Sequence, residues 1–157
     1  MSQLGNFTYD EISIGQTAHY SKRIEEQDVK LFAALSGDVN PLHLDAEYAA
    51  GTPFGERIAH GMLTGALVSA ALAMELPGPG TIYLGQSLKF RLPVKMGDTI
   101  TVSLEVIDKQ DRRQVVTLDC KACNQAGKVG ASGTAEVIAP AQKLRLERPP
   151  LPQVAIL

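Results

Sequence analysis

The chain has 157 residues, of which 45% are hydrophobic, and this suits one domain with a sizeable core, because a chain of roughly 150 residues buries about two-thirds of its unfolded surface. Lys and Arg number 15 against 17 Asp and Glu, a formal net charge of −2, and no run of five like charges occurs. This balance argues against nucleic-acid or membrane-surface binding that is driven by bulk charge.

The N-terminal part of the chain predicts a strand and then a helix. Polar and acidic residues stand where a secretory signal would have a basic start and an apolar stretch, so we expect a cytoplasmic protein. A strand is expected over residues 17–24. Residues 25–36 have apolar side chains at helical spacing and an acidic first turn, which suits the positive end of a helix dipole. Gly37 is placed to end this helix as a C-cap glycine.

The middle of the chain predicts a loop, a short helical turn and a buried helix. A loop is expected from Asp38 onwards, because Pro41 disfavours helix at the residue before it, and a helical turn is expected over 45–50. The apolar stretch 61–74 is uncharged but too short for a membrane span of about 20 residues, so it predicts a helix inside the protein. The following stretch 77–85 lacks the Lys-Ser/Thr of a phosphate loop and is interpreted as a helix stop.

The second half of the chain predicts antiparallel strands. Apolar and polar residues alternate in four segments, 87–92, 99–106, 115–122 and 129–138. Helices followed by strands indicate an α+β domain, in which an antiparallel sheet wraps one long central helix. Open sheet edges are commonly closed by a partner, so we expect a homodimer that joins two sheets. The domain is predicted over residues 1–140, with a Pro-rich tail over 141–157.

Two cysteines form a C-x-x-C pattern. On a strand, Cys120 and Cys123 would face opposite sides of the sheet, and no second pair follows that would complete a zinc site. We therefore interpret both as ordinary strand residues, with no metal bound there.

The densest polar cluster beside apolar sequence lies at residues 36–45. Asp38 and His43 are five residues apart, and on a bent loop a carboxylate and an imidazole at this spacing can converge on one water molecule. The alternative is a structural turn, with a helix cap at Gly37, an Asx turn at Asp38 or Asn40, and a surface histidine.

A second candidate site lies where the buried helix begins. The N–H of Gly61 would point at an approaching anion and can act as an oxyanion donor. The alternative is a simple N-terminal glycine, with His60 as a cap or core residue. Ser69, two turns further along, either hydrogen-bonds a site residue or serves as a small packing residue.

Three segments together carry a family resemblance. Residues 32–45 (FAALSGDVNPLHLD), 57–63 (RIAHGML) and 83–90 (YLGQSLKF) resemble the MaoC-like, (R)-specific enoyl-CoA hydratases, in particular the short, single-domain type that supplies (R)-3-hydroxyacyl-CoA for polyhydroxyalkanoate synthesis. The resemblance implies a hot-dog fold, a homodimer, and neither a metal nor a redox cofactor. It spans about residues 15 to 138.

The resemblance also implies residue roles. The family's catalytic Asp and His fall on Asp38 and His43, its supporting serine on Ser69, its backbone oxyanion donor on Gly61, and a residue that shapes the site loop on Asn40. The expected reaction is the syn hydration of trans-2-enoyl-CoA to (R)-3-hydroxyacyl-CoA, with one water molecule held between the catalytic pair. The sequence does not assign the separate proton transfers to either residue.

The acyl chain is expected in an apolar tunnel, for whose wall we name Leu67, Leu72 and Met74. Basic residues near its mouth can meet CoA phosphates or can simply be solvated: Arg57, Lys89, Arg91 and Lys95. Three other functions stay open, namely a hot-dog acyl-CoA thioesterase, a non-catalytic acyl-CoA-binding or assembly subunit, and a dehydratase that acts on a carrier-bound 3-hydroxyacyl group.

Overall fold

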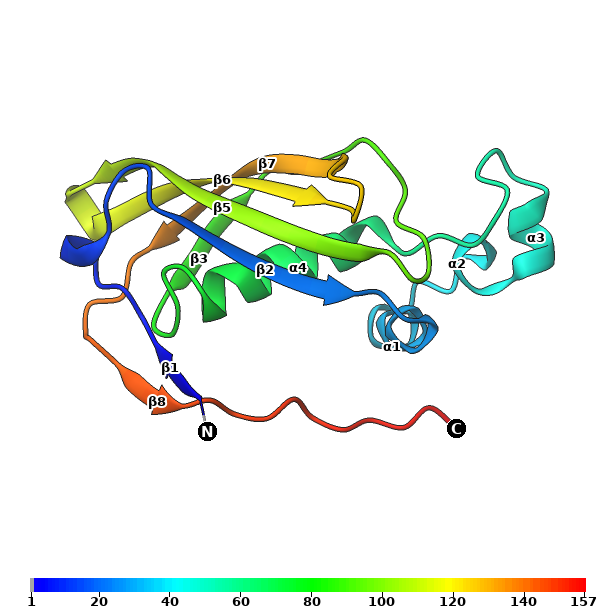
Figure 1. Cartoon of the computed structure of the whole chain (residues 1–157), viewed down its shortest axis with the longest axis horizontal. Helices are drawn as coiled ribbons and strands as arrows, with labels where there is room; N and C mark the ends of the chain where they lie inside the picture. Colours follow the sequence, from blue (N-terminus) through cyan, green and yellow to red (C-terminus); the bar gives the residue numbers. More distant parts are fainter. Residues whose placement is uncertain (1) are drawn as a thin grey trace.

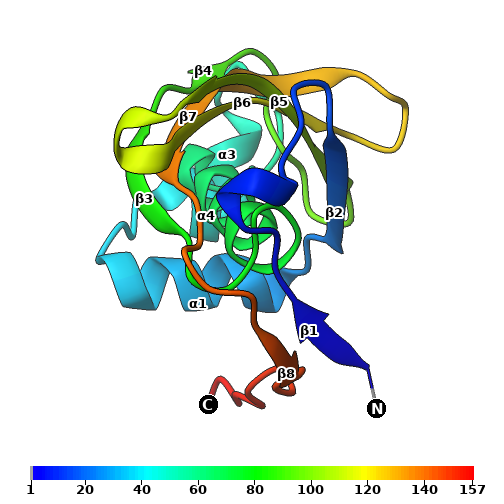
Figure 2. The same cartoon turned by 90° about the vertical axis from the view of Figure 1, so that its left-hand side faces the viewer.

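A six-stranded antiparallel sheet arches over one long helix in the computed structural model, which describes residues 2–157 (Figure 1, Figure 2). The strands follow the order β2-β5-β6-β7-β3, with β4 also paired to β7. Their bounds are β2 Thr17–Arg23, β3 Ile82–Gln86, β4 Lys89–Phe90, β5 Thr99–Gln110, β6 Val115–Cys123 and β7 Val129–Ile138. The predicted α+β, hot-dog architecture is thereby confirmed.

The central helix is α4 (Gly61–Met74), and α1 (Glu26–Ser36) lies on the side of α4 that is opposite the sheet (Figure 2). Helix α4 buries a row of larger side chains, namely Leu63, Leu67, Val68, Ala71 and Leu72. Another face of the helix stays open, since the Met62 side chain is 60% exposed and Ala66 and Ala73 are exposed too. The sheet therefore wraps α4 on one side and leaves a strip of small residues uncovered.

Both cysteines lie on β6, and they face opposite sides of the sheet as predicted. Cys120 is fully buried, whereas Cys123 is partly exposed, and both are free thiols. Burial raises the pKa of the Cys120 thiol to about 11, so this thiol stays protonated at neutral pH.

Two local predictions were wrong. The segment after Asp38 contains a short helix, α2 (Pro41–Leu44), because proline is tolerated at the first helical position, where its missing N–H needs no acceptor. The predicted strand 87–92 forms only over residues 89–90, as β4, and the chain leaves the hydrogen-bonded ladder between β3 and β4. Strand β3 covers part of the stretch interpreted only as a helix stop, since its pairing with the distant β7 decides its conformation.

The expected C-terminal tail contributes a strand as well. Strand β1 (Gln3–Gly5) pairs with β8 (Arg145–Glu147), and buried Asn6 fastens this ribbon to the body through its side-chain amide. The amide nitrogen donates to the carbonyls of Pro79 and Gln142, both at 2.9 Å. The remaining elements are α3 (Ala46–Ala50) and 3₁₀ turns at Tyr9–Glu11 and Arg112–Gln114.

The gap between β3 and β4 depends on Gly133 of β7. A methyl group at this position would lie 1.8 Å from the carbonyl oxygen of Ser87, a clash with backbone that no side-chain rotation relieves. We expect Gly133→Ala to lower the free energy of unfolding by about 3 kcal/mol in urea denaturation. Gly85→Ala in β3 is the control, because that site has open space around it. Equal denaturation midpoints for the two variants would contradict the prediction.

Candidate active site

The loop between α1 and α2 carries Asp38, the carboxylate of the predicted catalytic pair. Helix α1 ends at Gly37, whose left-handed backbone (φ 80°) turns the chain sharply. The Asp38 N–H then donates to Ser36 Oγ at 3.1 Å, and the Asn40 N–H donates to Asp38 Oδ1 at 3.2 Å. The Asn40 side chain caps α2 by accepting from the Leu42 N–H at 3.1 Å. Local hydrogen bonds thus hold the carboxylate of Asp38 in place.

Asp38 and His43 come together at the surface end of this loop. Asp38 Oδ2 and His43 Nε2 are 3.9 Å apart, with the Asp38 side chain 49% exposed and that of His43 only 10% exposed. His43 Nδ1 lies 2.8 Å from the carbonyl oxygen of Ile58. Because a carbonyl only accepts, Nδ1 carries the hydrogen, and Nε2 of the neutral ring offers a lone pair. Two acceptors at this separation can share one water molecule, which donates one O–H to each.

His60 completes the cluster, although the sequence indicated only a cap or core role for it. Its ring stacks on that of His43, with centroids 3.8 Å apart and planes inclined by 26°. Its Nε2 lies 2.9 Å from the carbonyl oxygen of Asp38, and the Phe32 ring packs nearby at 4.8 Å. One signal in the sequence points to this role, because His60 directly precedes the predicted oxyanion donor Gly61.

Arg57 is also used inside the protein. Its Nε donates to the carbonyl of His43 at 2.8 Å and its Nη1 to Glu26 Oε1 at 3.0 Å. Hydrogen bonding from Arg57 is the main reason that the pKa of the Glu26 carboxyl is lowered. The guanidinium expected near CoA phosphates is thus engaged with α1 and with the backbone of α2.

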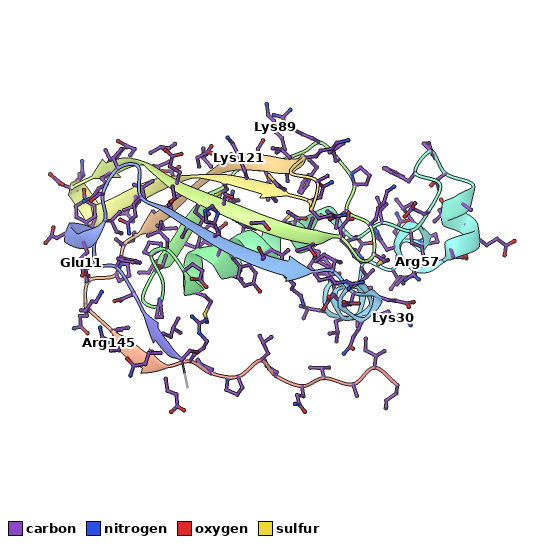
Figure 3. All side chains as sticks on the ribbon, viewed as in Figure 1. Glu11, Lys30, Arg57, Lys89, Lys121 and Arg145 are labelled. Atoms are coloured by element: carbon purple, nitrogen blue, oxygen red, sulfur yellow. The ribbon has the colours of Figure 1, made fainter. Side chains whose placement is uncertain are left out.

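The other basic candidates differ in their surroundings. Lys95 pairs with Glu56 at 3.5 Å, and Arg91 Nε lies 3.4 Å from Ser132 Oγ. Lys89 points away from α4 on the outer side of the sheet (Figure 3). Arg91 also lines a pocket.

That pocket, of about 250 Å³, lies beside the N-terminus of α4. His60 and Gly61 line it together with apolar side chains, among them Ile58, Phe90 and Leu92. As the first residue of α4, Gly61 has an N–H without an acceptor inside the helix, at the positive end of the helix dipole. The pocket therefore joins apolar walls to a backbone donor beside the His43–His60 stack.

The structure places the remaining predicted residues further away. Ser69 is half-buried on α4, and the rise of the helix alone separates it from Gly61 by about 12 Å. Leu67 and Leu72 are buried in the core, and Met74 is half-buried at the far end of α4. The 250 Å³ pocket is lined by other residues than these.

Asp38, His43 and His60 each place a potential metal-ligating atom within 4.8 Å of the other two. Their hydrogen bonds point to another use, because the Nε2–H of His60 and the Nδ1–H of His43 are both donated to carbonyls. The free acceptors that face each other are those of Asp38 and His43, a set suited to hold a water molecule. Within residues 2–157, none of the helices is long and apolar enough to span a membrane.

Comparisons with known proteins agree on one family. The model of the MaoC like domain matches residues 11–124. The (R)-specific enoyl-CoA hydratase of Rhodospirillum rubrum is 46% identical over 134 residues, which cover 85% of this chain and 92% of that protein. Among solved structures, the unliganded R-hydratase PhaJ1 of Pseudomonas aeruginosa superposes with a TM-score of 0.93 and 55% identity, covering 99% of each chain. The (R)-hydratase of A. caviae, involved in PHA biosynthesis, superposes with a TM-score of 0.80 and 46% identity, covering 82% of this chain and 98% of that one.

Proposed function

This chain belongs to the MaoC-like domain family, and from that premise we propose that it is an (R)-specific enoyl-CoA hydratase, a hydro-lyase that converts trans-2-enoyl-CoA to (R)-3-hydroxyacyl-CoA. The observation that carries the proposal is the pair of facing acceptors, Asp38 Oδ2 and His43 Nε2, 3.9 Å apart. Such a pair binds the reactant water through both of its hydrogens and leaves its oxygen lone pairs free to attack carbon.

The proposed reaction proceeds from this bound water. One member of the pair takes a proton as the water oxygen bonds to C3, and the electron pair of the C2=C3 bond shifts toward the thioester carbonyl oxygen. The Gly61 N–H donates to that oxygen, and the pair returns a proton to C2. Both new bonds form on the face of the substrate that meets Asp38 and His43, so the addition is syn. The pocket beside Gly61 offers apolar space for one arm of the thioester.

Gly61 allows the oxyanion donor to be removed without changing the backbone. His60, with φ −61° and ψ 139°, already has the conformation of a residue that precedes proline, and proline is tolerated at the first helical position. We expect Gly61→Pro to lower kcat/KM for crotonyl-CoA by about 100- to 1,000-fold, because it deletes one N–H donor.

Gly61→Ala is the matched control, since it keeps the N–H and adds a methyl group 3.3 Å from the exposed ring of Phe90. If the proline and alanine variants were equally active, Gly61 would not be the oxyanion donor.

We propose a homodimer that joins two sheets at β3. Among residues 2–157, this strand pairs only with β7, on one side, and its Ile82 and Leu84 side chains are 55% and 43% exposed. An open, apolar edge strand favours pairing with another chain, and the uncovered face of α4 gives a second apolar surface. Light scattering after size exclusion is expected to give twice the 16.8 kDa of one chain. A monomer mass at micromolar concentration would contradict this.

We further propose that residues 1–140 form the catalytic domain and that 141–157 is an accessory tail. Its support is that the model of the MaoC like domain matches residues 11–124, whereas residues 141–157 lie outside that match.

The function is tested by mixing the purified protein with crotonyl-CoA and, separately, with a medium-chain 2-enoyl-CoA. Loss of enoyl-thioester absorbance without release of free thiol, together with the (R)-3-hydroxy product in chiral analysis, is the expected result. Release of free thiol would instead indicate a thioesterase. Silence on both substrates, with turnover of a carrier-bound enoyl group, would move the activity to carrier-protein substrates.

A further inference from the structure

We propose that His60 is a positioning residue, which holds the backbone of Asp38 and the ring of His43 in the geometry that binds the reactant water. The inference rests on the proposed hydratase function and adds a residue to which neither the sequence patterns nor the comparisons assign a part in the reaction.

His60 contacts both members of the pair without facing the water site itself. The carbonyl of Asp38 receives its Nε2–H at 2.9 Å, and the ring of His43 lies against its own at 3.8 Å between centroids. The Asp38 carbonyl belongs to the exposed loop after α1, whereas His60 is only 2% exposed and begins the central helix. A buried residue at the start of α4 thus holds the exposed loop that carries Asp38.

The unused nitrogen of His60 supports a functional reason for this ring. With Nε2 committed as a donor, Nδ1 of the neutral ring is an acceptor, and it is buried without a hydrogen-bond partner among the described residues. A buried polar atom without a partner lowers stability, and native proteins carry few of them. An apolar residue would pack here without that loss, but it would not hold the Asp38 carbonyl.

The two stacked rings must carry opposite tautomers. His43 has its hydrogen on Nδ1, which faces the Ile58 carbonyl, and His60 has its hydrogen on Nε2, which faces the Asp38 carbonyl. Each ring thus donates its hydrogen to a backbone carbonyl, which leaves Nε2 of His43 as an acceptor for the water molecule. The same stack keeps Nε2 of His43 directed toward Asp38, so that a tilt of His43 would lengthen the 3.9 Å separation.

The kinetic experiment separates the two contacts of His60. His60→Gln keeps an N–H donor at the reach of Nε2, His60→Phe keeps a ring against His43, and His60→Ala keeps neither. We expect His60→Ala to lower kcat for crotonyl-CoA by about 100-fold with KM changed less than about threefold, because a displacement of the catalytic groups by about 1 Å can lower the rate by this factor. The kcat values of His60→Gln and His60→Phe are expected to lie between those of His60→Ala and the wild type. The matched control is His19→Gln, an exposed histidine on β2 that bonds only Ser103 and should keep wild-type kcat.

A spectroscopic measurement makes the inference independent of turnover. The chain has only 3 histidines, so long-range ¹H–¹⁵N spectra of the histidine-labelled protein assign each ring. The expected spectrum shows His43 as the Nδ1–H tautomer and His60 as the Nε2–H tautomer, with the His43 signals shifted in His60→Gln and unchanged in His19→Gln.

The possible outcomes are distinct. A folded His60→Ala with wild-type kcat, or a wild-type spectrum with His43 as the Nε2–H tautomer, would overturn the positioning role. A wild-type protein that leaves enoyl-CoA unchanged would refute the proposed function instead, and the tautomer spectrum would still decide the geometry assigned to His60.

Discussion

Asp38→Asn is expected to hydrate crotonyl-CoA at least about 1,000-fold more slowly than the wild type, at an unchanged melting temperature. The Asn40 N–H donates to Oδ1 of Asp38, so an asparagine here would keep its amide oxygen at that position and turn its NH₂ group toward His43. The facing acceptor would become a donor, which bonds Nε2 of His43 in place of the water molecule. The loss thus arises from reversed hydrogen-bond polarity at nearly constant shape.

Steady-state kinetics with circular-dichroism melting tests this expectation. Asp45→Asn is the matched control, because Asp45 caps α3 at the next turn, where its Oδ1 accepts from the Tyr48 N–H. Turnover by Asp38→Asn within tenfold of the wild type would refute the water-binding pair.

Removing the imidazole of His43 is expected to cause a loss of similar size, about 1,000-fold in kcat. Because His43 is buried, His43→Ala also deletes packing and the bond to Ile58, and it can lower stability. His43→Asn is the sharper variant, since its amide can still donate toward the Ile58 carbonyl while no group replaces Nε2. Both variants are expected to bind a non-reactive acyl-CoA analogue with near wild-type affinity.

The double variant Asp38→Asn/His43→Asn gives the decisive comparison. Since both side chains act on one water molecule, the double loss should be close to the larger single loss, far from the product of the two. Independent, multiplicative losses would show that the two residues act on different groups.

Much of the architecture could be predicted from the sequence because its signals are local. The helix 25–36 and the glycine at its end, the buried helix at 61–74 and the four strands β2, β5, β6 and β7 each follow from residue patterns within about a dozen residues. The sequence missed β3 and β8 and made β4 too long, and the partners of these strands, β7 and β1, lie far away in the chain. A strand of two to five residues has too little pattern of its own to be recognised.

The sequence by itself determined the central helix and the strands with clear alternation, because side-chain periodicity acts between neighbouring residues. It also offered Asp38 and His43 as a candidate pair, beside the alternative of a structural turn. The tertiary structure alone decided the direction in which that pair faces. The Ile58 carbonyl selects the tautomer of His43 from 15 residues away, and His60 reaches the Asp38 carbonyl from 22 residues away. Such contacts form only when the fold brings the start of α4 against the loop after α1, since hydrogen bonds and ring stacking act over a few ångströms of space, whatever the separation along the chain.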